Sequence, residues 1–171
     1  RRQPDLHARE LLEPMMNKRS QSGFTLVELM AVVVVAAILL MVTVPSFVSM
    51  LARMRIEGSA NELTTDLQYA RAESLQRGAN VTVQITTGGT GYTVTCAGCS
   101  STIKTVNLSS GITVAGGPVT FSSLRGMSTS NADVNFALTS VATTASLTVT
   151  VPANSGSVQL CGSGIPGYSS C

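Results

Sequence analysis

A long uncharged stretch near the N-terminus restricts the fold of this chain more than any other feature. Between Phe24 and Ala52 the only charged side chain is that of Glu28. About 20 apolar residues are enough for a helix to cross the hydrocarbon core of a bilayer, so this stretch predicts a transmembrane helix. A carboxylate in lipid costs about 2.5–3.5 kcal/mol on insertion scales, and Glu28 therefore needs a counter-charge or a function.

The residues on either side of this stretch predict its orientation. Lys18 and Arg19 precede it, and the positive-inside rule then places the N-terminus in the cytoplasm. Everything after Ala52 should lie across the membrane, where the four cysteines of the chain fit an oxidising compartment. Ser, Thr, Gly, Val and Asn dominate beyond Ala79, which is typical of a β-rich extracytoplasmic domain.

A small residue, Gly23, stands before the apolar run. An ordinary secretory signal instead carries its small-residue cleavage site after the apolar core. Cleavage after Gly23 would remove the basic stretch and leave the apolar helix on the mature protein.

The segment "GFTLVEL", Gly23 to Leu29, resembles the processing site of the type IV pilin and type II secretion pseudopilin superfamily. The resemblance implies that a prepilin peptidase cuts after Gly23 and methylates the new N-terminal residue, Phe24. It also implies that Glu28 is an assembly contact, neutralised by the amine of Phe24 in the same or a neighbouring subunit. The alternative is that Glu28 is only a tolerated polar residue near the membrane surface. Pro45 falls where many pilins carry a proline, and its missing amide predicts a helix kink.

Three later segments narrow the resemblance to minor pilins of the GspH/FimT type. They are Asp66–Val83, Val119–Gly126 ("VTFSSLRG") and Gly156–Gly164 ("GSVQLCGSG"). The implied fold is α+β and pilin-like, with a long N-terminal transmembrane and amphipathic helix packed on a C-terminal antiparallel β domain.

These observations divide the chain into four parts. Residues 1–23 are the leader, 24–52 the transmembrane and assembly helix, 53–78 an amphipathic helix packed on the globular domain, and 79–171 a β-rich periplasmic domain. Residues 1–14 have no place in the resemblance, whereas "MNKRSQSG" from Met16 resembles a short leader. We therefore expect residues 1–14 to derive from a misassigned upstream start or a fragmentary gene model.

Apolar spacing predicts the face with which the amphipathic helix packs. Steps of four and three residues connect Ile56, Ala60, Leu63, Leu67, Ala70 and Ser74. Arg53–Glu57 and Glu73–Arg77 are expected as opposite-charge pairs on the solvent side, and Gly78 is placed to end the helix.

Alternating residues after the helix predict strands. The first two segments are separated by the turn sequence "GGTG" and indicate a hairpin. The predicted strands are Asn80–Thr87, Tyr92–Cys96, Thr102–Leu108, Ile112–Ala115, Val119–Phe121, Val134–Leu138, Leu147–Val151 and Ser157–Cys161.

No pattern in the chain predicts an enzyme, a cofactor or a metal site. The only histidine, His7, lies in the leader, so a catalytic triad has no base in the mature chain. "CAGC", Cys96 to Cys99, could be half of a zinc or redox site, but the other cysteines are not spaced as a second half. We favour two local structural disulfides, Cys96–Cys99 and Cys161–Cys171, among the three pairings that four cysteines allow.

The resemblance predicts a structural subunit of a type II secretion pseudopilus or a type IV pilus, in the bacterial inner membrane. Its expected partners are other pilins or pseudopilins, the prepilin peptidase and the membrane. The alternative is a FimT-like DNA-binding minor pilin for natural transformation. Nucleic acid is the less favoured partner, because the tail "CGSGIPGYSSC" has no Arg or Lys, and Lys104 and Arg125 are expected to be isolated surface charges.

Overall fold

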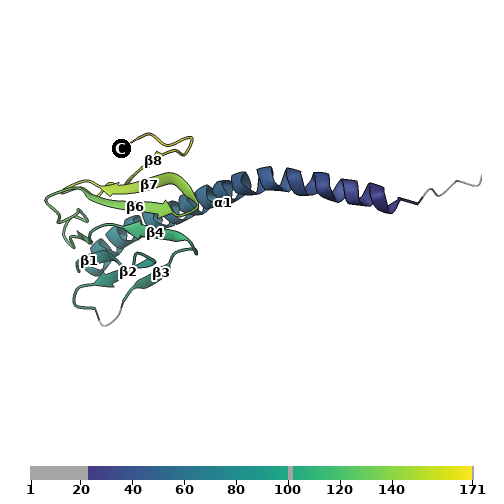
Figure 1. Cartoon of the computed structure of the whole chain (residues 1–171). Coiled ribbons are helices and arrows are strands. Elements are labelled where there is room, and N and C mark those ends of the chain that lie inside the picture. Colours follow the sequence, from purple (N-terminus) through teal and green to yellow (C-terminus); the bar gives the residue numbers. More distant parts are fainter. Residues whose placement is uncertain (1–22, 100–101, 171) are drawn as a thin grey trace, which may run out of the picture. The chain divides into compact units, whose positions relative to one another are not determined.

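The computed structural model describes residues 23–99 and 102–170 (Figure 1). Within them the backbone forms one helix, α1 (Leu26–Arg77), followed by eight strands. The strands are β1 (Val81–Ile85), β2 (Gly91–Cys96), β3 (Lys104–Asn107), β4 (Ile112–Ala115), β5 (Val119–Phe121), β6 (Val134–Ser140), β7 (Thr143–Val151) and β8 (Gln159–Ser163). The predicted α+β order, with one long N-terminal helix, is confirmed.

Each predicted strand segment coincides with or overlaps an observed strand, and the main difference is at the hairpin of β6 and β7. There the strands extend to Ser140 and from Thr143, although the predicted strands ended at Leu138 and began at Leu147. The extra residues are Ser, Thr and Ala, and Ala145 is buried although its neighbours are polar. Small side chains produce little hydrophobic alternation, so the pattern understated this hairpin.

The strands form two antiparallel four-stranded sheets. The first has the order β3-β2-β1-β5 and the second the order β4-β6-β7-β8. The predicted hairpin of β1 and β2 is present, with Val83 opposite Val94, and Gly88 and Gly89 in its turn have positive φ. The amide of Val114 in β4 donates to the carbonyl of Gly89 at 2.9 Å, which links the second sheet to this turn.

The chain divides into two compact units between Leu40 and Met41, and α1 runs through the boundary. In the first unit, every described side chain from Phe24 to Leu40 is exposed. By length and composition, α1 contains a segment near the N-terminus that could cross a membrane, with a mean hydropathy of 2.8. The helix continues through Pro45, and the kink expected there stays a prediction.

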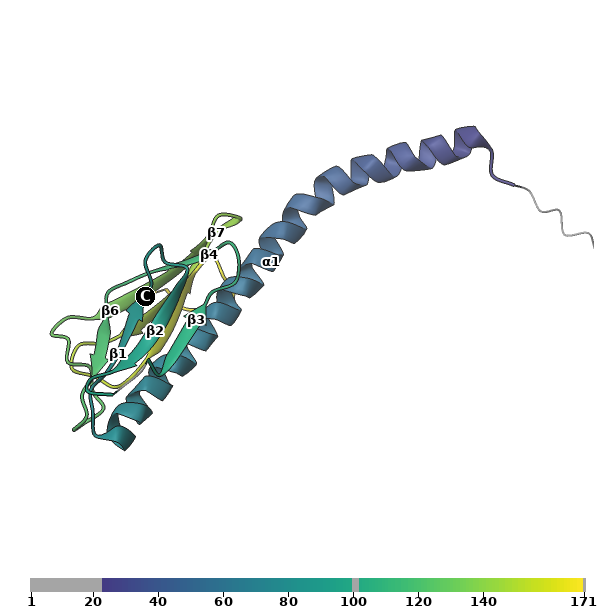
Figure 2. The ribbon, with the colours of Figure 1, turned by 90° about the horizontal axis from the view of Figure 1, so that it is seen from below.

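In the second unit, the last part of α1 packs on both sheets, and Figure 2 shows it running along the strands. All six side chains of the predicted face are buried, which confirms that face. The buried face of α1 also includes Ala52, Ser59, Asp66 and Glu73. Gly78 follows the last helical residue with a φ of 61°, which confirms its place at the helix end.

One core joins α1 to the two sheets. Its largest fully buried side chains come from all three layers: Ile56, Leu63 and Leu67 from α1, Tyr92 and Phe121 from the first sheet, and Phe136, Leu138 and Leu147 from the second. The second unit therefore buries its own apolar face.

Candidate functional site

The start of α1 is shaped by Thr25. Its hydroxyl oxygen accepts a 3.2 Å hydrogen bond from the amide of Glu28, and its carbonyl accepts one from Leu29 at 3.1 Å. Thr25 is therefore the N-cap of the helix, and Glu28 occupies the third helical position, as in a capping box. A carboxylate in the first turn also favours the positive end of the helix dipole, so Glu28 stabilises the helix start whatever else it does.

Glu28 has no cationic partner inside the described chain. The two ion pairs among the described residues are Glu73–Arg77 and Asp66–Lys104, and neither involves Glu28. Around Glu28, large apolar side chains such as Phe24, Leu26 and Met30 are more than half exposed. The described part of the first unit, residues 23–40, thus exposes an apolar helical surface with one acid, unpaired among the described residues, in its first turn.

A buried carboxylate, Asp66, connects α1 to the first sheet. Both of its oxygens lie 2.8 Å from the Nζ of Lys104 in β3, and the hydroxyl of Tyr92 in β2 donates to Oδ2 at 2.8 Å. Asp66 and Tyr92 are buried, and Lys104 is partly exposed. The expectation that Lys104 is an isolated surface charge is wrong, because the ammonium group neutralises this carboxylate.

Tyr92 is held in its neutral form by the same environment. Burial, and then the hydrogen bond to Asp66 and the nearby negative charge, raise the pKa of the Tyr92 hydroxyl above its ordinary value. Asp66, Tyr92 and Lys104 were not singled out from the sequence as a group. A signal was present, since Asp66 lies three residues after Leu63, inside the apolar stripe, where an acid requires a buried partner.

The sequence also predicted two ion pairs on the solvent side of α1, and these are only partly present. Glu73 and Arg77 form the expected ion pair, in which Arg77 is exposed to solvent but Glu73, contrary to the expectation, is buried. Within the described residues Arg53 and Glu57 do not pair, and both extend from the part of the helix nearest the apolar stretch.

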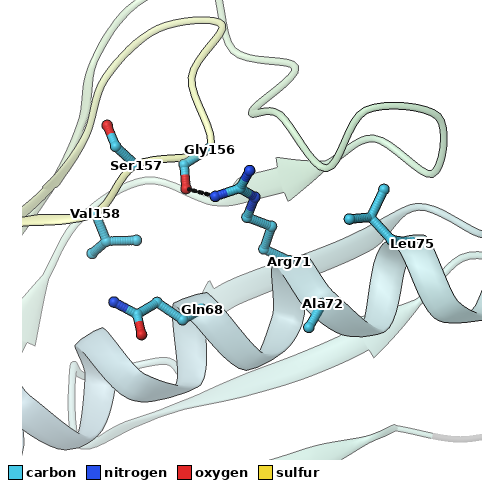
Figure 3. Close-up of a pocket in the computed structure, with 7 residues that line it drawn as sticks. All are labelled: Gln68, Arg71, Ala72, Leu75, Gly156, Ser157 and Val158. Atoms are coloured by element: carbon cyan, nitrogen blue, oxygen red, sulfur yellow. Dashed lines mark hydrogen bonds between the residues drawn. The ribbon is translucent and has the colours of Figure 1, made fainter.

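Arg71 ties the loop before β8 to α1. Its Nη1 donates a 2.9 Å hydrogen bond to the carbonyl of Gly156 (Figure 3). A Cβ at position 156 would lie 2.5 Å from the guanidinium carbon and 2.8 Å from the backbone carbonyl oxygen of Gly126, so a larger residue there would displace the Arg71 side chain from this contact. The groove of about 550 Å³ around this contact is lined by Gln68, Arg71, Ala72, Leu75, Gly156, Ser157 and Val158. No Asp, Glu or His is in that lining, so Ser157 has no general base beside it.

The cysteines are consistent with an oxidising compartment. Cys96 and Cys99 are joined by a disulfide, with their Cα atoms 5.3 Å apart. Their sulfurs are bonded to each other in this structure and are not thiolate ligands. Cys171 lies outside the described residues, so its expected bond to Cys161 stays a prediction.

An apolar membrane-length helix segment, continued by a helix that packs on antiparallel sheets, defines the pilin-like class to which minor pilins and pseudopilins belong. The solved minor pilin FimU of Pseudomonas aeruginosa has this fold: it is 20% identical, covers 63% of this chain and 89% of its own, and gives a TM-score of 0.53. The minor pseudopilin EpsH from the type 2 secretion system of Vibrio cholerae is 15% identical, covers 65% of this chain and 99% of its own, and also gives 0.53. At such identities the likeness shows the fold.

Two family models match the sequence itself. Residues 59–166 match type II transport protein GspH, and residues 18–44 match the prokaryotic N-terminal methylation motif. No curated protein matches the chain significantly. The GspH match covers more than half of the sequence, and the chain belongs to the GspH family of minor pilins and pseudopilins.

Proposed function

We propose that this chain is a minor structural subunit of a type II secretion pseudopilus or a type IV pilus. In this proposal a prepilin peptidase removes residues 1–23 and methylates Phe24. Residues 24–52 then anchor the subunit in the bacterial inner membrane, and residues 53–171 lie in the periplasm. The observation that carries the proposal is the exposed apolar surface of the first unit, with a single acid, Glu28, in its first turn.

An isolated subunit cannot leave this surface in water. Burying one large apolar side chain is worth about 1.5–3 kcal/mol, and the described first unit exposes its apolar side chains along its whole length. Lipid can cover them before assembly, and the helices of neighbouring subunits can do so in a filament. The carboxylate of Glu28 gains more from the second environment, because a neighbouring Phe24 amine supplies the counter-charge that lipid lacks.

The observations favour this structural role over DNA binding. Affinity for the phosphate backbone requires several cations that are free to contact it. Lys104 is engaged by Asp66, and Arg71 is bonded to the Gly156 carbonyl. Arg125 is exposed, but residues 126–170 contain no Arg or Lys to extend it into a basic surface.

Processing is the first test of this proposal. Mass spectrometry of the chain extracted from membranes should find methylated Phe24 as the first residue, because the small Gly23 precedes it at the expected cleavage site. A Gly23→Val variant should keep its leader, since a bulky side chain stands at the cleaved bond. An uncleaved chain in cells with an active prepilin peptidase would contradict the proposal.

Partner identity is the second test, and it separates the two systems. Chemical cross-linking in intact cells, followed by purification and mass spectrometry, should recover pilins of a pilus or pseudopilins of a secretion system. Recovery of neither, from cells that process the chain correctly, would refute the structural role. A gel shift with DNA at low salt tests the alternative directly.

A further inference from the structure

An apolar groove lies at one end of the second unit. Phe47, Leu51 and Arg55 of α1 line one side, and residues 110–112 and 140–142 line the other. Its volume is about 270 Å³. Figure 2 shows the turn between β6 and β7 beside α1 at this place. All of these residues belong to the second compact unit.

The rim of this groove is more apolar than a water-facing turn requires. Val141, at the tip of the hairpin of β6 and β7, is 99% exposed, and Phe47 is 63% exposed. Two-residue hairpin turns usually carry Asn, Asp or Gly, whereas Val141 and Ala142 occupy this one. A single exposed valine is ordinary, but this one lies beside the last exposed apolar residues of a membrane-length stretch.

The position of the groove along the sequence matches the lipid headgroup layer. A span of about 20 helical residues counted from Phe24 ends at Thr43. Phe47 is four residues further, and the uncharged stretch continues to Ala52. The Phe47 end of the groove thus lies where a helix leaves the hydrocarbon and enters the headgroups, and Arg55 lies eight residues, about 12 Å, farther along the helix axis.

Charge at the groove also suits a phospholipid. Residues 105–124 and 134–171 carry no charged side chain, so both loops that line the groove are neutral. The charge in the lining is that of Arg55, which is exposed. Arg55 is a cation on the translocated side of the proposed span, and a guanidinium pairs well with a phosphate.

We infer that this end of the β domain contacts the membrane in the unassembled subunit, with Val141 and Phe47 among the headgroups and Arg55 on a phospholipid phosphate. The inference rests on the proposed membrane anchor. It assigns the groove to the phospholipid surface and gives the β domain a second attachment to the bilayer, which must be released when the subunit enters a filament.

Tryptophan fluorescence tests this contact, because the chain has no Trp of its own. The full-length Val141→Trp variant is reconstituted in vesicles of phosphatidylglycerol and phosphatidylethanolamine, with and without bromine on the upper part of the acyl chains. Lipid contact should shift its emission to the blue, and the brominated lipid should quench it. Leu124→Trp is the matched control, because Leu124 is also exposed, at 88%. Its loop lies against Leu75, which is 24 residues further along α1 than Leu51 of the groove, so it is far from the proposed membrane contact. Its emission should stay red and unquenched.

A third variant, Leu29→Trp, reports whether the helix is inserted. Quenching of Leu29→Trp without quenching of Val141→Trp would overturn the inference and leave the membrane anchor intact. If Leu29→Trp is not quenched either, the proposed anchor itself fails. A blue shift of Val141→Trp without quenching would show that protein and not lipid surrounds this position, which also overturns the inference.

The role of Arg55 is tested in the Val141→Trp background. Quenching should be stronger in brominated phosphatidylglycerol than in brominated phosphatidylcholine, and Arg55→Gln should abolish this difference. Arg53→Gln is the control, because Arg53 does not line the groove. Equal loss in the two variants would contradict the assignment of the phosphate to Arg55.

Discussion

The carboxylate of Asp66 accepts hydrogen bonds from Lys104 and Tyr92 inside the interface between α1 and the first sheet. Removing one partner of a buried ion pair costs more than the pair contributes, because the remaining charge has lost its partner but not its desolvation cost. At the scale of single residues, this contact should therefore be the most sensitive polar position of the second unit.

The Asp66→Ala variant should lower the free energy of unfolding by about 1–3 kcal/mol, chiefly through the buried Tyr92 hydroxyl, because the Lys104 side chain is 39% exposed and can be solvated. The Lys104 ammonium and the Tyr92 hydroxyl would both lose their acceptor. Urea denaturation followed by circular dichroism, in detergent micelles, measures the change. Glu62→Ala, at an exposed position of the same helix, should change it by less than about 0.5 kcal/mol. Similar values for the two variants would show that Asp66 is not held as described.

Tyr92 predicts a dependence of stability on alkaline pH. Its pKa is raised in the folded state, so its contribution is complete below the unfolded pKa and is lost as pH rises above it. The unfolded hydroxyl ionises near pH 10. Above that pH the free energy of unfolding should fall by up to about 1.4 kcal/mol per pH unit because of this group. Tyr92→Phe should reduce the slope by that amount, and an unchanged slope would assign the alkaline instability to other groups.

At the scale of elements, the buried face of α1 holds the helix on the two sheets. Leu63 and Leu67 are among its largest fully buried side chains. An aspartate at either position would place an unpaired charge in the apolar core. Leu67→Asp should therefore cost more than about 4 kcal/mol and unfold the second unit.

Leu75→Asp is the matched control for this prediction. Leu75 lies on the same helix and is 47% exposed, so the same change should leave the unit folded. Circular dichroism and thermal melting of both variants, in the same detergent, give the comparison. A folded Leu67→Asp variant with an unchanged melting temperature would mean that the helix packs with another face.

The elements themselves were largely predictable because their signals are local. Apolar steps along α1 and alternation in the strands reflect burial on one face, and Gly78 marks the helix end through its own backbone. The contacts between elements were not predictable. Asp66 and Lys104 are 38 residues apart, and Arg71 and Gly156 are 85 residues apart. Such pairs depend on how the sheets dock on the helix, and spacing along the chain carries no information about that.

The burial of Glu73 has the same origin. Its charge and its spacing of four residues from Arg77 predict a position on the solvent side. The structure buries Glu73 because it lies at the edge of the buried face, one residue before Ser74. A one-residue difference around a helix is 100°, and the width of a buried face is set by the sheets that cover it.

At the scale of the whole molecule, the two units have different requirements. The second unit buries its apolar face on its own sheets, while the described part of the first exposes apolar side chains and an acid that has no cationic partner among the described residues. Changes in the first unit should therefore affect assembly and leave the second unit folded. Glu28 is the position where this separation can be tested.

The Glu28→Ala variant should enter the membrane as well as the wild type or better, because an apolar residue replaces a costly one. The second unit should stay folded, since the buried face of α1 begins at Ala52. Co-purification with partner pilins should fall sharply, because the neighbouring Phe24 amine loses its counter-charge. Membrane fractionation and pull-down of partners, carried out on the same cells, measure the two effects separately.

Thr25→Ala separates assembly from helix capping. The hydroxyl oxygen of Thr25 accepts a hydrogen bond from the backbone amide of Glu28. The Thr25→Ala variant should therefore weaken the helix start by about 1 kcal/mol while it keeps the Glu28 carboxylate. If Glu28 acted only by stabilising the first turn, Thr25→Ala should reduce partner recovery at least as much as Glu28→Ala. We expect the opposite order, because the charge and not the cap is what a neighbouring amine recognises. Unchanged recovery of partners with Glu28→Ala, at unchanged insertion, would leave the acid with a role in the helix start alone.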